Sequence, residues 1–381
     1  MVLFDIETAV RDRYAEGAKA AQPALCCPTD GYDGRYLTIL PDEIVEKDYG
    51  CGDPTRFVNE GEVVVDLGSG AGKNCYIIAQ KVGELGRVIG VDMNDAMLDL
   101  SRSYVDEIAS KIGYHNTKFV RAKIQDLALD LDMLNEWIVR NPITTVQQMM
   151  ELEAECDRLR RESPLIATGT VDVVVSNCVL NLVKPEDKQQ LFAEIFRVLK
   201  RGGRAVISDI VCDELPTQAI MDDPDLWSGC ISGAFLETEF LEMFENAGFH
   251  GIEILVRQEE SWQVIDGVEF RSLTVRAYKG KQGECLEHHQ AVIYKGPWKS
   301  VQDDDGHTLV RGARMAVCAK TFGLYTDLNG PYANAVIGIE PYAIAPNGEA
   351  NAFSCNSDSF RDARQTKGLD YRVTIEPQAC C

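Results

Sequence analysis

Three cysteines stand beside small or polar residues in segments that lie far apart along the chain. They are Cys51 in Tyr-Gly-Cys-Gly, Cys178 in Ser-Asn-Cys-Val-Leu-Asn-Leu and Cys230 in Trp-Ser-Gly-Cys-Ile-Ser-Gly. A glycine-rich loop, Asp66-Leu-Gly-Ser-Gly-Ala-Gly72, lies between the first two in the sequence. Isolated cysteines are usually small buried hydrophobes. Three thiols together with a glycine loop instead suggest thiolates that hold a soft atom beside a nucleotide-like cofactor.

The glycine loop has the spacing Gly68-x-Gly70-x-Gly72, preceded by Asp66. Glycine accepts unusual dihedral angles and has no side chain, so a ligand can approach the backbone closely. Dinucleotide folds prefer the spacing G-x-G-x-x-G, which places a pyrophosphate at a helix start, and this loop departs from it.

Asp92 ends the segment Val-Ile-Gly-Val-Asp, where an acidic residue can accept hydrogen bonds from ribose hydroxyls. Together, Asp66 and Asp92 suit a cofactor with a cationic amino acid and a ribose but no phosphate. The alternative is structural: the two carboxylates cap helices, and the glycines only make a tight turn.

The elements that must position these residues alternate between strand and helix. Short apolar runs at 63–67, 87–92 and 117–121 are typical of buried strands, and helical stretches at 74–82 and 96–111 separate them. The alternation resumes with strands at 171–176 and 204–209 around a helix at 186–199. Regular alternation predicts right-handed βαβ units, hence an α/β fold with a doubly wound, mostly parallel sheet.

The remaining segments suggest extensions of that sheet and a smaller C-terminal domain. Residues 5–20 have apolar positions at helical spacing, and after Pro216 we expect a helix at 238–247 and strands at 252–256 and 270–278. The predicted domains are an N-terminal helix and cysteine-bearing loop at 1–60, a cofactor-binding domain at 61–215 with a helical insertion at 127–170, a substrate-binding extension that completes the sheet at 216–280, and a C-terminal domain and tail at 281–381.

Composition narrows the class of partner. The chain has 381 residues and a formal net charge of −22, from 38 basic and 60 acidic side chains. This charge disfavours nucleic acids and anionic membranes as partners. The N-terminus has neither a basic leader nor a long apolar stretch, so we expect a cytoplasmic protein whose thirteen cysteines stay reduced.

The segment Val65-Asp-Leu-Gly-Ser-Gly-Ala-Gly with Gly90-Val-Asp-Met resembles the S-adenosylmethionine loop of class I methyltransferases, over about residues 61–215. The resemblance implies that Asp66, Gly68 and Gly70 surround the methionine moiety of that cofactor. It further implies Asp92 and Met93 at the ribose and adenine, the turn Ile124-Gln125-Asp126 near the adenine, and Asn177 on the sulfonium side.

The three cysteine segments extend this likeness, and together they resemble the arsenite S-adenosylmethionine methyltransferases. That family implies an enzyme in which Cys51, Cys178 and Cys230 bind trivalent arsenic and arsenic receives the methyl group, a reaction used in arsenic detoxification. It also implies a redox or relay thiol near the N-terminus, for which Cys26 and Cys27 are both candidates. A reductant such as thioredoxin or glutathione would return the protein thiols to the reduced state.

Two other functions fit part of the pattern. One is methylation of another soft acceptor, such as selenium, tellurium or a small thiol, which needs fewer converging cysteines. The other is a non-catalytic metalloid-binding protein, which has no use for a methyl donor.

The C-terminal region contains a scattered set of side chains that could bind zinc: Cys285, His288, His289, His307 and Cys318. The terminal pair Cys380-Cys381 could bind metalloid, or it could belong to a disordered tail whose cysteines have no function.

Overall fold

The computed structural model describes residues 6–20, 31–355 and 359–372. They divide into two compact units, residues 1–279 and 280–381. The predicted segments 1–60, 61–215 and 216–280 therefore lie within the first unit, except for the last residue. Cys26, Cys27, Cys380 and Cys381 lie outside the described residues.

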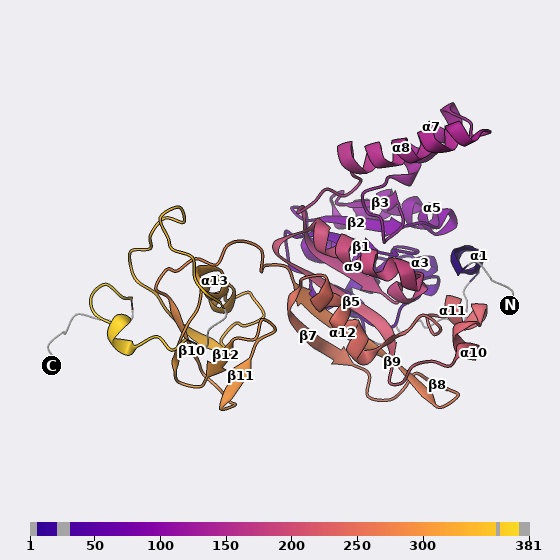
Figure 1. The fold of residues 1–381 in the computed structure, drawn as a ribbon. Helices are drawn as coiled ribbons and strands as arrows, with labels where there is room; N and C mark the ends of the chain where they lie inside the picture. Colours follow the sequence, from indigo (N-terminus) through magenta and orange to yellow (C-terminus); the bar gives the residue numbers. More distant parts are fainter. Residues whose placement is uncertain (1–5, 21–30, 356–358, 373–381) are drawn as a thin grey trace. The chain divides into compact units, whose positions relative to one another are not determined.

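The first unit is built on a nine-stranded sheet, whose main path has the order β3-β2-β1-β4-β5-β9-β7 (Figure 1). The first five strands of this path pair in parallel. They are β1 (Val63–Leu67), β2 (Arg87–Asp92), β3 (Thr117–Arg121), β4 (Val171–Asn177) and β5 (Leu199–Cys212). Two antiparallel partners follow, β9 (Val268–Tyr278) and β7 (His250–Arg257), with the short strands β6 (Phe235–Leu236) and β8 (Gln263–Ile265) at the side. The predicted doubly wound, mostly parallel sheet is confirmed.

Helices cover both faces of this sheet because alternate strand residues point to opposite sides. Val65 and Leu67 pack into one hydrophobic cluster and Val64 into the other. Figure 1 shows α9 (Pro185–Val198) and α12 (Glu237–Asn246) together on one side. The opposite face packs against α3 (Asp42–Glu46), α4 (Lys73–Val82), α5 (Asp95–Ser103) and α6 (Val105–Ile112).

One predicted helix is in fact two. The stretch 96–111 was expected to be continuous, but it breaks at Tyr104, whose φ of −104° and ψ of 0° are not helical. The buried hydroxyl of Tyr76 donates a hydrogen bond to the carbonyl of Ser101, a group that would otherwise continue the helix. Tertiary packing therefore overrides the local helical pattern.

The insertion at 127–170 forms a helical pair, α7 (Leu131–Arg140) and α8 (Val146–Glu162). Helix α8 begins at a reciprocal cap, in which the Thr145 hydroxyl accepts from the Gln148 N–H while the Gln148 side chain accepts from the Thr145 N–H. The site-bearing segments of the first unit add several short helices and one longer one. These are α1 (Ile6–Lys19), α2 (Gly34–Leu37), η1 (Pro54–Phe57), η2 (Leu180–Leu182), α10 (Gln218–Met221) and α11 (Pro224–Ser228).

The second unit has its own core around Val292, Met315 and Phe322. A three-stranded sheet has the order β13-β10-β14, and a separate two-stranded ribbon pairs β11 with β12. The bounds are β10 (Ala291–Tyr294), β11 (Ser300–Gln302), β12 (Thr308–Val310), β13 (Arg314–Ala316), α13 (Ala319–Thr326), β14 (Val336–Ile339) and η3 (Ala363–Gln365). The sequence predicted none of these strands, because each is only three or four residues long.

No helix in the described ranges is long and apolar enough to cross a membrane.

Candidate active site

The three cysteines meet although up to 179 positions separate them, and all are buried in one small cluster of the first unit. Cys178 directly follows β4, and Cys230 follows α11. Cys51 lies in the loop before η1. The structure therefore brings these three segments together at the carboxyl edge of the parallel sheet.

Two of these cysteines have a strained backbone. Cys178 has φ of +63° and Cys230 has φ of +65°, in the left-handed region that side chains with a Cβ rarely adopt. Such a conformation costs about 1–2 kcal/mol per residue. Short backbone hydrogen bonds hold both, from Cys178 N–H to the Ser208 carbonyl at 2.8 Å and from Cys230 N–H to the Trp227 carbonyl at 3.0 Å. Backbone strain that is maintained in this way is more typical of functional positions than of cysteines that only pack in the core.

Cys178 is the shared neighbour of the other two thiols. Its pKa is raised well above the ordinary value by hydrogen bonding with Cys230 and Cys51, and by burial. The Cys230 thiol also donates to the Cys178 carbonyl, with Sγ and O 3.0 Å apart. At neutral pH Cys178 is therefore a protonated thiol that needs a thiophilic ligand to displace its proton.

Asn177 holds the Cys51 loop through both ends of its side-chain amide. Its Oδ1 accepts from the backbone N–H groups of Cys51 and Gly52, at 2.9 and 3.0 Å. Its Nδ2 donates to the Gly52 carbonyl at 2.8 Å and to the Tyr32 hydroxyl at 3.0 Å. The side chain thus holds the Cys51 loop, and it is not among the residues that line the adjacent pocket.

The glycines around Cys51 have a packing reason. A Cβ on Gly50 would lie 2.3 Å from Asn177 Nδ2, and one on Gly52 would lie 2.7 Å from Ser208 Oγ. Only glycine lets this backbone lie against both side chains. Cys51 itself is buried, and the two glycines serve this close approach of the backbone.

Asn181 has the matching role for the third cysteine, and the sequence analysis missed it. Its Nδ2 donates to the carbonyls of Cys230 and Ile210, at 3.2 and 2.6 Å. The segment Ser176-Asn-Cys-Val-Leu-Asn-Leu therefore supports the Cys51 loop at one end and the Cys230 loop at the other, with Cys178 between them.

Helix α1 covers the site, which the sequence also did not reveal. The Tyr14 hydroxyl is hydrogen-bonded with Cys230, and burial first, then electrostatic interaction with Cys230 and Cys178, raises the pKa of that phenol well above its usual range. Arg13 fastens the helix to α11 through the Ser228 hydroxyl, at 2.7 Å. The Asn94 amide fastens it to the sheet side through the Arg11 carbonyl, at 2.8 Å.

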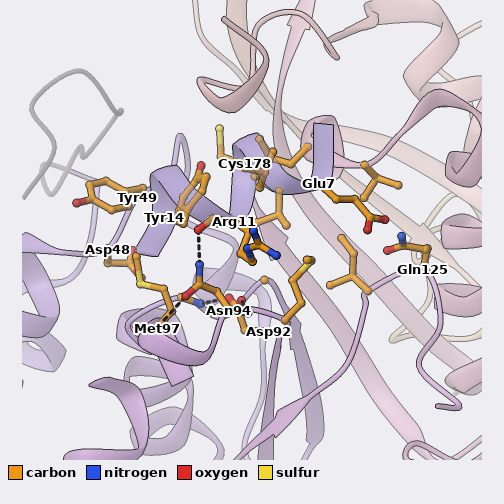
Figure 2. Close-up of a pocket in the computed structure, with 18 of the residues that line it drawn as sticks. Glu7, Arg11, Tyr14, Asp48, Tyr49, Asp92, Asn94, Met97, Gln125 and Cys178 are labelled. Atoms are coloured by element: carbon orange, nitrogen blue, oxygen red, sulfur yellow. Dashed lines mark hydrogen bonds between the residues drawn. The ribbon is translucent and has the colours of Figure 1, made fainter. Parts of the chain in front are cut away.

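A pocket of about 900 Å³, open solvent included, lies between α1 and the sheet edge. Figure 2 shows Arg11 and Tyr14 of α1 around it together with Asp92, Asn94 and Cys178. Its size suits a cofactor-sized ligand. Six of the residues predicted for the cofactor line it: Gly68, Gly70, Asp92, Met93, Ile124 and Gln125.

The two aspartates that were predicted to contact the cofactor, Asp66 and Asp92, differ in their position relative to the pocket. Asp92 lines the pocket and accepts from the Gly70 N–H at 2.9 Å and the Asn94 N–H at 2.8 Å. Asp66 does not line it: its carboxylate is buried and accepts from the Cys75 thiol of α4 at 3.2 Å. Burial raises the pKa of Asp66 to about 8, with the charges of Asp48 and Asp92 adding to the rise.

Comparisons with known proteins agree with this geometry. The profile of a family described as a methyltransferase domain matches residues 58–163 and 152–248, and that of a domain of unknown function, DUF8838, matches 281–371. An arsenite methyltransferase from Aquipseudomonas alcaligenes is 30% identical over 317 residues, which span 79% of this chain and 81% of the relative. One from Mus musculus is 28% identical over 305 residues, which span 77% and 72%. The crystal structure of an arsenic(III) S-adenosylmethionine methyltransferase from Chlamydomonas reinhardtii is 27% identical, with a TM-score of 0.53 over 87% of this chain and 99% of that one.

The sheet order, the glycine loop and the pocket define an S-adenosylmethionine-dependent methyltransferase of the class I fold. The chain belongs to the arsenite methyltransferase family, since it covers most of a relative that is 30% identical.

The pocket fits the methyl donor of this class. Gly70 has φ of +50°, and a Cβ there would have no neighbour closer than Asp48 Oδ1 at 4.0 Å, so the loop leaves open space on its pocket side. The lining combines the carboxylates of Glu7, Asp48 and Asp92 with three basic side chains, and Glu7 and Asp48 are themselves paired with Lys123 and Lys73 at 2.8 Å. No phosphate-binding cation is required.

Proposed function

We propose that this chain transfers methyl groups from S-adenosylmethionine to trivalent arsenic held by Cys51, Cys178 and Cys230. The observation that carries the proposal is the position of Cys178. It lines the cofactor pocket, and it is also the shared neighbour of the other two thiols. A soft atom bound there would lie at the border between the thiol cluster and the methyl donor.

The chemistry follows from the ligand set. Trivalent arsenic is thiophilic, as are the soft metals that select thiolate ligands. Bound to three sulfurs it is pyramidal, and it keeps a lone pair on the side opposite to them. Arsenic has no proton to lose when it attacks carbon, so the chain needs no general base. Orientation of that lone pair is then the main contribution of the protein.

When bound, S-adenosylmethionine supplies an electrophilic methyl group on a sulfonium centre. We assign Asp92, Met93, Ile124 and Gln125 to the ribose and adenine side, and the loop of Gly68 and Gly70 to the methionine side. Asp66 would act on this loop by fixing its position. We reassign Asn177 as a positioning residue for the Cys51 loop rather than a cofactor ligand.

Helix α1 would close the site during the reaction. Tyr14 directs a hydroxyl to Cys230, and Arg11 and Val10 line the pocket from the same helix face. Exclusion of water from bound arsenic limits hydrolysis of the arsenic–sulfur bonds. The helix must move when cofactor or product leaves.

The electron balance requires a reductant. Formation of an arsenic–carbon bond from the lone pair takes arsenic from the trivalent to the pentavalent state. Two protein thiolates can return a pair of electrons by forming a disulfide, which thioredoxin or glutathione would then reduce. Cys26 or Cys27 would serve as the relay thiol in this exchange. Because the cycle needs reduced thiols, we also propose a cytoplasmic location.

The test is incubation of the full chain with methyl-labelled S-adenosylmethionine, a thiol reductant and one acceptor at a time. Arsenite, selenite, tellurite and a small thiol serve as the acceptors. We expect labelled methylarsenicals as the dominant product. If the label appears in a selenium, tellurium or thioether product instead, that acceptor and not arsenic is the substrate. If no product is labelled, the chain is a metalloid-binding protein without catalytic activity.

A further inference from the structure

A second group of three cysteines lies in the C-terminal unit. The sulfur atoms of Cys285, Cys318 and Cys355 all lie within 4.8 Å of one another. Cys318 is buried, and the other two are partly exposed. The sequence had paired Cys285 and Cys318 with histidines, but the structure joins them to Cys355 instead, which no motif had marked.

The main chain brings the three segments together. The Phe353 N–H donates to the Cys285 carbonyl at 2.7 Å, and Leu286 forms a bridge with Ala352. The Ala319 N–H donates to the Leu286 carbonyl at 2.9 Å. Residues 285–287, 318–319 and 351–355 are therefore held in register by backbone bonds that do not involve the thiols. Such a cluster is preformed.

Cys318 lies where a thiolate is favoured. Its sulfur caps α13, accepting from the Thr321 N–H at 3.4 Å, and lies 3.2 Å from the Thr321 hydroxyl. Burial raises its pKa, but the hydrogen bonds from Thr321, Cys285 and Cys355 outweigh burial, so that the pKa lies below the usual value. Burial and the bond to Cys285 raise the pKa of Cys355 to about 12. Cys318 thus accepts hydrogen bonds from Thr321 and from both neighbouring thiols.

We propose that Cys285, Cys318 and Cys355 form a second binding site for trivalent arsenic, separate from the site of methyl transfer. The choice of metalloid rests on the proposed function; the existence of a three-thiol site does not. Binding from arsenous acid is balanced: three As–O bonds break, three As–S bonds form, and each thiol proton leaves with a hydroxide as water. No electron is transferred.

Two features favour arsenic over zinc. Structural zinc takes four ligands, and within the described ranges the group offers three. Three thiolates on arsenic also give a neutral complex, whereas the same three on zinc leave a net negative charge in a half-buried place. The nearby Asp303, Asp305 and His307 already have charged partners, because Asp303 pairs with His307 at 2.9 Å and Asp305 pairs with Lys281 at 2.9 Å.

The experiment measures arsenic bound per chain, so it does not depend on methyl transfer. The full chain carries C51S and C178S to remove the first site, and C26S, C27S, C380S and C381S to remove the cysteine pairs. This background is reduced, mixed with arsenite, desalted and analysed for arsenic content, and X-ray absorption counts the sulfurs on arsenic. We expect about one arsenic per chain with three sulfur neighbours.

Adding C318S, or C355S as a second variant, should weaken binding at least tenfold. The matched control is C156S, which replaces a partly exposed cysteine of α8 outside both groups. Circular dichroism and thermal unfolding verify that each variant folds. A folded background chain that binds no arsenic would overturn the proposal, and so would one tightly bound zinc per chain that arsenite does not displace. If the labelled-methyl assay fails but this binding persists, only the proposed function is lost.

Discussion

The two cysteine groups are built differently. Cys285, Cys318 and Cys355 bring all their sulfurs within 4.8 Å of one another, and Cys51, Cys178 and Cys230 are not among the described groups that reach this distance. Cys178 has a raised pKa and a strained backbone, while Cys318 has a lowered pKa and caps a helix. In the first group Cys178 is hydrogen-bonded with both other thiols beside a pocket, whereas in the second group all three sulfurs lie close to one another.

This difference matches the tasks that we assign. A thiol set that must release a methylated product should hold it less tightly than a set that retains arsenic. Its loops are held by the side chains of Asn177 and Asn181 as well as by backbone hydrogen bonds. The C-terminal set is held by backbone hydrogen bonds, which favour retention.

The largest effect is expected from C178S. This substitution removes the shared neighbour of both other thiols, and methylation should fall by roughly a thousandfold or more, since positioning of arsenic is lost. Binding of S-adenosylmethionine, measured by calorimetry, should change little. The control C156S should methylate at the normal rate. Normal turnover by C178S would remove the active-site assignment.

N177A should be next. The Cys51 loop loses three hydrogen bonds and Tyr32 loses one. Because supporting residues of a ligand set commonly contribute about 10- to 100-fold, we expect about that loss in kcat/KM for arsenite. Cofactor affinity should stay within about twofold. The exposed N329A serves as control. A large loss of cofactor affinity with arsenite KM unchanged would instead restore Asn177 to the cofactor.

Y14F should have a smaller effect. It deletes the hydroxyl that reaches Cys230 but keeps the ring that covers the site, so we expect a three- to tenfold rise in arsenite KM, in line with one hydrogen bond of about 1 kcal/mol. Y104F, whose hydroxyl bonds Glu43 at 2.6 Å, is the control. If both variants behave like the unsubstituted chain, α1 does not touch the substrate site through Tyr14.

The last prediction concerns the stability of the C-terminal unit, where no effect on methyl transfer is expected. Burial raises the pKa of Asp303, but hydrogen bonds from His307 and Tyr325 outweigh it and lower the pKa from 3.8 to about 2. The bond to Asp303 raises the pKa of His307 above 6.5. Ionised Asp303 therefore contributes to the free energy of unfolding above pH 3.8, and this contribution is lost as the pH falls through about 2. Stability from His307 is present below pH 6.5 and is lost as pH rises through its raised pKa.

The pair should therefore stabilise most between about pH 4 and 6.5. D303N should lower the free energy of unfolding there by up to about 2 kcal/mol, with a smaller difference at pH 2 and pH 9. Thermal unfolding of both chains at these pH values checks this. A difference independent of pH would mean that the ion pair does not act as described.

The sequence was informative wherever position follows from local pattern. Strand β1, the glycine loop and Asp92 follow one another within 30 residues, and a parallel sheet places all carboxyl ends at one edge. Cys178 could be placed for the same reason. Asn181, Tyr14 and Cys355 could not, because their roles depend on which loop or helix folds back onto them. The spacing of 37 residues between Cys318 and Cys355 has no local signature.

The central claim is that only arsenic on Cys51, Cys178 and Cys230 receives a methyl group. The direct test loads one equivalent of arsenite on two variants of the reduced chain, removes free arsenite, adds labelled S-adenosylmethionine and follows a single turnover. One variant carries C285S, C318S and C355S, and the other carries C51S, C178S and C230S. We predict that the first methylates its bound arsenic and that the second retains arsenic without methylating it. Methylation by the second variant, or none by the first while it still binds arsenic, would contradict the account.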